Sequence, residues 1–148
     1  MGLRHLGREL ALKALYQMDV SGDSSLESVA AFFAEQPGDD RARRFARELV
    51  VGVCAEKDAL DQKLGESIQH WSIKRLSRID HNILRIGLYE LLRLDDIPAP
   101  VTIDEAIELA KRYGDRDSGP FVNGVLDKMA NRLGLMSKGG DDYASKGD

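Results

Sequence analysis

Residues 118–129 read SGPFVNGVLDKM, and whether this stretch is a hairpin or a helix decides the fold class. The dipeptide Asn123-Gly124 is, by itself, a strong signal for a two-residue hairpin turn. Around it, apolar residues recur with the period of a helix and continue past the glycine on one stripe, namely Val122, Val125, Leu126, Met129 and Leu133. Neither flank alternates as a strand does, so we interpret the stretch as one helix that contains a glycine.

The rest of the chain shows the same helical period, and no segment has convincing strand alternation. Three helix starts carry the signature of a capping box, in which a hydroxyl residue precedes an acidic one by three positions: Ser24 with Glu27, Ser77 with Asp80, and Thr102 with Glu105. Helices are predicted at about residues 4–20, 24–36, 39–65, 79–91, 102–113 and 121–133, with a compact stretch over 68–76. The predicted fold class is all-α, with about seven helices and no sheet.

The length and composition bound the class of protein. A chain of 148 residues is predicted to form one domain over residues 1–136, followed by a polar tail over 137–148 that we expect to be disordered. The net charge of −4 argues against indiscriminate binding to nucleic acid but permits a small local site. No apolar run approaches a membrane span, and the N-terminus is too charged for a signal peptide, so we expect a cytoplasmic protein.

The sequence offers no motif for enzyme chemistry. It has no phosphate-binding glycine loop and no nucleophile elbow. The single cysteine, Cys54, and the three scattered histidines show no metal-ligand spacing. The carboxylates of Asp104, Glu105 and Glu108 are explained by a helix cap and a solvated helix face. We therefore expect no catalysis, no cofactor and no bound metal.

The first predicted helix carries a modest cationic patch. Its polar face holds Arg4, Arg8 and Lys13, with His5 among them. Arginine side chains bind phosphates and guanine edges, which favours a nucleic-acid contact. The alternative is a solvated helix face that binds nothing, as most charge runs are.

Phe121 and Gly124 raise a second functional question. Phe121 lies near the edge of the apolar arc of the last helix, and Gly124 lies one turn later on the side away from the core. An aromatic ring at an exposed helix start, beside a small residue, suits stacking with an unpaired base. Alternatively, Phe121 folds inward and Gly124 lets another helix pack closely.

Three segments together resemble the NusB family of bacterial transcription antitermination factors: RELALKALYQMD (8–19), WSIKRLSRIDHNILRIGLYELL (71–92) and IPAPVTIDEAIELAKRYGDRDSGPFVNGVLDKM (97–129). The resemblance implies an all-α fold of two packed helical subdomains and RNA binding without catalysis. It also implies a partner, the ribosomal protein NusE, with which family members bind the boxA element of nascent RNA, notably in ribosomal RNA operons. The pair helps to load other Nus factors onto RNA polymerase.

The resemblance also implies site residues. The arginine-rich N-terminal motif of the family corresponds to Arg4, His5 and Arg8, and His5 occupies a usual arginine position. RNA binding through this segment is therefore expected to be weaker, or more dependent on pH and on the partner. The other residues expected at the RNA are Asp117, Ser118, Phe121 and Asn123. The residues expected at NusE are Tyr16, Lys74, Arg75 and Asp80.

Other functions compete with this interpretation. In a protein–protein scaffold of the transcription machinery without direct RNA contact, Phe121 would belong to the core, and Arg4 and Arg8 would be solvated. A related branch of RNA methyltransferases continues into a large cofactor-binding domain and is not expected for a chain of this length. Some family members form homodimers that would cover the basic patch, and the sequence leaves this possibility open.

Overall fold

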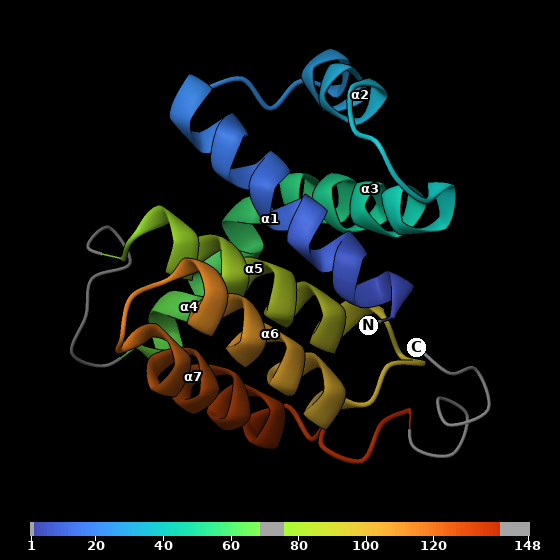
Figure 1. The fold of residues 1–148 in the computed structure, drawn as a ribbon. Helices are drawn as coiled ribbons and strands as arrows, with labels where there is room; N and C mark the ends of the chain where they lie inside the picture. The colour runs from blue at the N-terminus through green and yellow to red at the C-terminus, as the bar shows by residue number, and fades with distance from the viewer. Residues whose placement is uncertain (1, 69–75, 140–148) are drawn as a thin grey trace.

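The computed structural model describes residues 2–68 and 76–139, and within these ranges it contains seven helices and no strand (Figure 1). The helices are α1 (Leu3–Ser21), α2 (Leu26–Ala34), α3 (Asp40–Ala55), α4 (Lys57–Ser67), α5 (Arg78–Arg93), α6 (Ala99–Tyr113) and α7 (Ser118–Arg132). The predicted all-α fold class is confirmed.

The helices form two packed subdomains, as predicted. In the first, α1 packs along α3, and α2 covers the end of this pair. In the second, α6 packs against α5 and α7, and α4 packs against α5 and α7 from the other side. The subdomains meet where α1 and α3 contact α5, so one continuous apolar core runs through both.

Helix α5 is the centre of the fold. It contacts α1, α3, α4, α6 and α7, and its residues are buried almost all round. A helix that is buried all round must satisfy any polar group it carries within the protein. The buried polar residues of α5 are Asn82, Arg85 and Glu90, and each forms hydrogen bonds with neighbouring helices.

The predicted helix over residues 39–65 is instead two helices that meet at Glu56. The backbone of Glu56 (φ −114°, ψ 17°) leaves the helical region. Helix α3 packs against α1, whereas α4 packs against α5 and α7. The apolar stripe continues across the break, from Val53 to Leu60, so periodicity did not reveal a change of direction that tertiary packing imposes.

Only one of the three predicted caps lies where it was expected. Ser77 caps α5 by accepting a hydrogen bond from the backbone N–H three residues later, at 3.0 Å. Helix α2 is capped by Ser25 instead of Ser24. Helix α6 begins earlier, with Pro98 as its N-cap residue and Pro100 in its first turn. Thr102 therefore lies inside the helix and donates a buried hydrogen bond to Glu90 at 3.0 Å.

The chain after α7 continues along the domain. Leu135 and Met136 pack against the core, and the Lys138 ammonium donates to the carbonyl oxygens of Glu90 and Leu94 at 2.8 and 2.9 Å. Burial lowers the pKa of Lys138. An ammonium at the C-terminal carbonyls of a helix is a favourable cap. The first residues of the segment predicted to be a disordered tail are therefore held against α5.

Candidate functional site

Arg8 lies in the protein interior, and the prediction that it belongs to an exposed basic patch is wrong. Its side chain is 1% exposed. Its Nε and Nη2 atoms both donate to Glu90 at 2.8 Å, and Nη1 donates to Glu105 at 3.2 Å. The ring of Phe45 lies 5.5 Å from its guanidinium carbon. Arg8 thus joins α1 to α5 and α6.

Arg4 and His5 also face acidic side chains. Arg4 pairs with Asp96 at 3.3 Å, and its side chain is 25% exposed. His5 lies between two carboxylates, with Nδ1 at 3.1 Å from Glu105 and Nε2 at 3.7 Å from Glu9. The segment that matches the arginine-rich motif therefore holds the start of α1 against the second subdomain.

Glu9 of α1 contacts two residues at the end of α6. Its Oε2 atom accepts a hydrogen bond from the Tyr113 hydroxyl at 2.7 Å and pairs with Arg112 at 3.0 Å. Burial raises the pKa of Tyr113, and the hydrogen bond to Glu9 raises it further. The guanidinium carbon of Arg112 and the ammonium of Lys13 lie 5.6 and 6.0 Å from the centre of the Tyr113 ring. The result is a fixed aromatic ring flanked by two cations.

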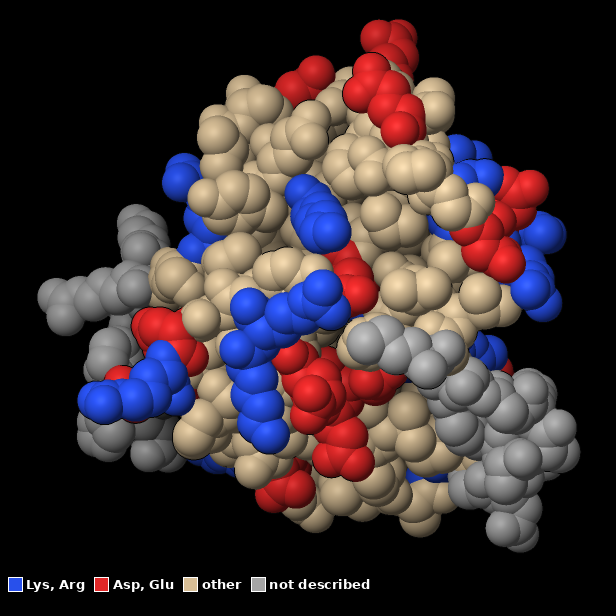
Figure 2. Space-filling model, in the orientation of Figure 1, with Lys and Arg blue, Asp and Glu red and all other residues tan. Residues whose placement is uncertain are grey.

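Two more exposed basic residues lie near this end of α6: Lys111 in its last turn and Arg116 shortly after it. Together with the two cations at the ring they are called the basic strip: Lys13, Lys111, Arg112 and Arg116. Figure 2 shows basic side chains gathered over α1 and the end of α6, beside acidic side chains over the first half of α6. The sequence analysis included Lys13 but missed the other three. The sequence did contain one signal for them, because two basic residues, Lys111 and Arg112, occur in the last turn of α6. Basic residues at this position are also favoured by the helix dipole, so they do not by themselves indicate a binding site.

The residues expected at the start of α7 differ in exposure. Asp117 and Asn123 are exposed, and Phe121 is half-buried against the core. Ser118 is buried, and its hydroxyl accepts from the backbone N–H of Asp115 at 3.0 Å. Ser118 therefore shapes the loop before α7, and its burial does not fit the predicted direct contact with RNA.

The start of α7 adjoins the basic strip. A Cβ atom placed on Gly119 would lie 3.7 Å from Cγ of Lys111. Gly119 therefore lies against the side chain of Lys111. We group the basic strip with the exposed or half-buried residues Asp117, Phe121 and Asn123 under one name, the α1–α6–α7 face.

An apolar groove borders this face. It has a volume of about 460 Å³. Its most prominent aromatic residue is Tyr16, whose accessible fraction of 42% is large for an aromatic side chain. The groove is lined by Leu12, Lys13, Tyr16, Gln17, Val20, Ile79 and Tyr113. Two of these residues, Lys13 and Tyr113, also belong to the aromatic and cationic cluster of the neighbouring face.

Asp80 lies in the first turn of α5, directly after the groove residue Ile79. Its Oδ1 atom is buried and has no hydrogen-bond partner within the described part of the chain. Lys74 and Arg75, also expected at the partner, lie outside the described residues.

The first turns of α5 are fixed by Asp61 of α4. Its carboxylate accepts from Nε and Nη2 of Arg85 at 2.8 and 2.7 Å and contacts His81 at 2.8 Å. Burial would raise the pKa of Asp61, but the hydrogen bonds from Arg85 and His81 outweigh it and hold the pKa well below its usual range. This arrangement keeps the start of α5, and with it Asp80, in place beside the groove.

Comparison with known proteins assigns the fold to a family. The model of the NusB family matches residues 5–131, which span both subdomains. The chain belongs to the NusB family. It is 44% identical over 138 residues to the transcription antitermination protein NusB of Sorangium cellulosum, covering 93% of this chain and 99% of that protein.

Solved NusB structures have the same fold. T. maritima NusB superposes with a TM-score of 0.79 at 38% identity, covering 88% of this chain and 92% of that one. A chain from a crystal structure of the antitermination factors NusB and NusE in complex with dsRNA superposes with a TM-score of 0.77 at 28% identity, covering 89% and 98%. The NusB fold thus extends over nearly all of the described residues.

Gly124 has no packing role in this NusB fold. It is exposed, and, apart from its chain neighbours and the backbone of its own helix, a Cβ atom at this position would meet no atom of the described residues within 4 Å. The alternative in which Gly124 lets another helix of the protein pack closely is therefore wrong. The open side of the glycine faces solvent.

Replacing Gly124 with alanine is expected to raise the free energy of unfolding by about 0.5–1 kcal/mol, because alanine favours the helix and meets no obstacle. Denaturant unfolding measures this gain. Gly65→Ala is a matched control, since Gly65 is also exposed in a helix with open space around it. A loss of stability specific to Gly124→Ala would show that the position is more crowded than described.

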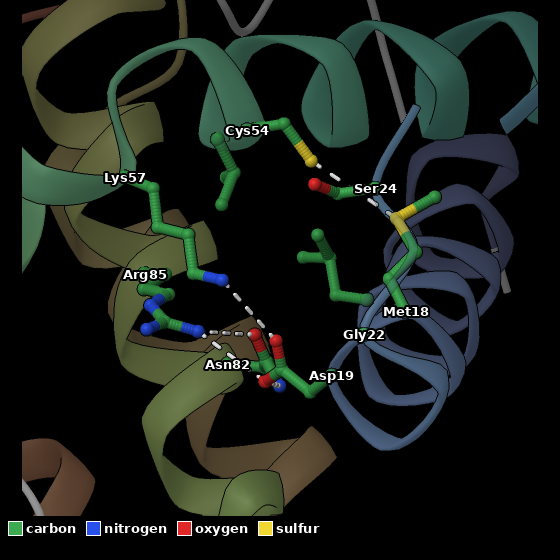
Figure 3. A pocket seen from close by; sticks show the side chains of 10 residues that line it. Met18, Asp19, Gly22, Ser24, Cys54, Lys57, Asn82 and Arg85 are labelled. Carbon is green, nitrogen blue, oxygen red and sulfur yellow. Dashed lines mark hydrogen bonds and ion pairs between the residues drawn. The ribbon is translucent and has the colours of Figure 1, made fainter. Parts of the chain in front are cut away.

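A small cavity lies between α1, α3 and α5, and polar side chains along its wall bond to one another (Figure 3). Its volume is about 110 Å³, and Asp19 within it contacts Lys57, Asn82 and Arg85 at 2.9–3.4 Å. Burial raises the pKa of the Cys54 thiol at its edge. A thiol with a raised pKa is poorly nucleophilic, so Cys54 does not have the character of a reactive cysteine.

Among the described residues, no group of three or more histidine, cysteine, aspartate or glutamate side chains is placed to hold a metal ion. No helix among them has the length and apolar character needed to cross a membrane.

Proposed function

We propose that this protein is a non-catalytic transcription antitermination factor that binds boxA RNA of nascent ribosomal RNA transcripts together with NusE. The observation that carries the proposal is the shared border of the α1–α6–α7 face and the apolar groove. Lys13 and Tyr113 belong to both surfaces, so RNA on the face and a protein in the groove would lie side by side. The pair would then assemble with other Nus factors on RNA polymerase.

The α1–α6–α7 face has the groups that single-stranded RNA requires. The basic strip offers cations for the phosphates, Phe121 offers a partly exposed ring, and Asp117 and Asn123 offer polar groups for base edges. Four cations on a protein of net charge −4 neutralise few phosphates. Binding by this protein alone is therefore expected to be weak, and a partner that adds charge and area should strengthen it.

The apolar groove has the character of a protein interface. Exposed Tyr16 and Val20 supply an aromatic and an aliphatic contact, and aromatic residues are enriched at such interfaces. The Asp80 carboxylate, next to the groove residue Ile79, supplies an acidic group near its edge. The related complex of NusB and NusE with dsRNA supports NusE as the occupant.

The experiment is a titration of fluorescent boxA RNA with the protein, alone and with equimolar NusE, at several salt concentrations. We expect NusE to tighten binding, and the affinity to fall steeply as salt rises, since phosphate contacts release counterions. Phe121→Ala should weaken the complex by about fivefold to a hundredfold, the range for loss of one stacked base. Phe32→Ala, on α2 in the first subdomain, is the control.

A scaffold without RNA contact is the second candidate, because Arg4, His5 and Arg8 are all engaged with acidic side chains. Binding of NusE with no RNA binding at low salt, by the protein or by the pair, would favour the scaffold. RNA binding that is unchanged in Phe121→Ala would place the RNA elsewhere on the protein.

A further inference from the structure

His5 is held in an asymmetric position between two carboxylates. Its Nδ1 atom lies 3.1 Å from Oε2 of Glu105. A carboxylate only accepts hydrogen bonds, so Nδ1 carries the proton in the neutral ring, and Nε2 presents its lone pair. Nε2 is buried, has no hydrogen-bond partner in the described structure, and faces Oε1 of Glu9 at 3.7 Å. Two acceptors therefore face each other while His5 is neutral.

The other carboxylate oxygen of Glu9 contacts two residues at the surface of the protein. Oε2 accepts from the Tyr113 hydroxyl at 2.7 Å and pairs with Arg112 at 3.0 Å. The Arg112 side chain is 59% exposed and belongs to the basic strip, so the same guanidinium is available either to Glu9 or to a ligand phosphate. Glu9 itself is buried, which keeps both contacts in a fixed geometry.

The remaining charged groups near His5 are already paired. On α6, Glu105 also accepts from Arg8, which is shared with Glu90 of α5. On α1, Arg4 pairs with Asp96 beyond the end of α5. From α3, the neutral ring of Phe45 lies against both arginines. Glu9 is thus the group whose interactions a proton on His5 would change most.

We propose that Glu9 is a positioning residue for RNA binding, and that protonation of His5 sets how strongly Glu9 holds Arg112. When Nε2 gains a proton, it becomes a donor and attracts the Glu9 carboxylate. Glu9 then neutralises Arg112 less, and Arg112 is free to pair with a phosphate. The RNA affinity should therefore rise as the pH falls. This inference rests on the proposed function, since it concerns the same RNA-binding surface.

The test measures boxA RNA affinity with NusE present at pH 8 and pH 6, the range in which histidines change charge, at several salt concentrations. For the unaltered protein we expect affinity about twofold to fivefold higher at pH 6, as for one exposed ion pair. The slope of log affinity against log salt should steepen by about 0.7, the value for one more phosphate contact to a single strand.

Four variants separate this mechanism from others. His5→Gln and Arg112→Gln should bind with little dependence on pH, because the proton or the released cation is missing. At pH 8, Glu9→Gln should bind RNA with the affinity that the unaltered protein shows at pH 6, because it lacks the carboxylate that neutralises Arg112. Its RNA affinity should not depend on pH. His81→Gln is the control and should retain it, since His81 contacts Asp61 elsewhere.

Two outcomes would overturn the proposal while leaving the proposed function intact. Equal pH dependence in His5→Gln and the unaltered protein would exclude His5 as the sensor. Persistent pH dependence in Glu9→Gln would show that the His5 charge acts on the RNA directly, without Glu9.

A second readout does not need RNA. In the free protein, the NMR signal of the Arg112 Nε–H group should move between pH 8 and pH 6, and should stay still in His5→Gln. A stationary signal in the unaltered protein would contradict the proposal. A moving signal without RNA binding at either pH would support the coupling and overturn the proposed function alone.

Discussion

Replacing Arg8 with methionine is expected to lower the free energy of unfolding by about 3–5 kcal/mol, because it leaves the buried carboxylate of Glu90 without its partner. Both side chains of this pair are 1% exposed, and two donor–acceptor distances of 2.8 Å join them. Glu105 loses a donor in the same variant. Denaturant unfolding at neutral pH measures the loss.

Arg93→Met is the matched control for this prediction. Arg93 also pairs with a glutamate, Glu56, through two guanidinium nitrogens, but its side chain is 55% exposed. Exposed ion pairs contribute about 1 kcal/mol or less to stability, so the free energy of unfolding of this variant should be close to that of the unaltered protein. If Arg8→Met were as mild as Arg93→Met and yet abolished RNA binding, Arg8 would act at the RNA, contrary to the structure.

Replacing Leu126 with alanine is expected to lower the free energy of unfolding by about 2–5 kcal/mol, because Leu126 is fully buried and its removal leaves a cavity. Leu126 of α7 packs against the bare backbone of Gly87 in α5. A Cβ atom on Gly87 would lie 2.6 Å from Cδ1 of Leu126. This contact sets the position of α7, and therefore of Phe121 and Asn123 on the α1–α6–α7 face.

A double-mutant cycle tests the contact between the two helices. Gly87→Ala alone should destabilise the protein by about 1–3 kcal/mol through overpacking. In the Leu126→Ala background the added methyl group should partly fill the cavity, so the combined loss should be smaller than the sum of the two. Strictly additive losses would mean that the two residues do not share this space. Leu133→Ala, at an exposed position, is the control and should change stability little.

The fold was predictable because each helix displays its period locally. The stripe from Val122 to Leu133 was sufficient to reject a hairpin at Asn123-Gly124. The break at Glu56 was not predictable in this way, since the apolar stripe continues across it and the change of direction depends on α5 and α7. Thr102 was mistaken for a cap because its partner, Glu90, belongs to another helix.

The candidate site was harder to predict, because exposure depends on contacts that are distant in sequence. Arg8 has the composition and position of an RNA-binding arginine, but Glu90 and Glu105 lie 82 and 97 positions away along the chain. Ser118 is buried through a turn with Asp115, which only the folded loop reveals. Conversely, Arg112 of α6 joins the surface of α1 through its ion pair with Glu9, so the sequence of the first helix alone did not indicate it.

The central claim is that RNA lies directly on the α1–α6–α7 face of this protein when NusE is bound. Photocrosslinking of boxA RNA containing 4-thiouridine to the complex, followed by mass spectrometry of the crosslinked peptides, tests it most directly. We predict crosslinks within residues 111–124, from the end of α6 to the first turns of α7. Crosslinks confined to NusE, or to α2 and α3 of this protein, would contradict the account.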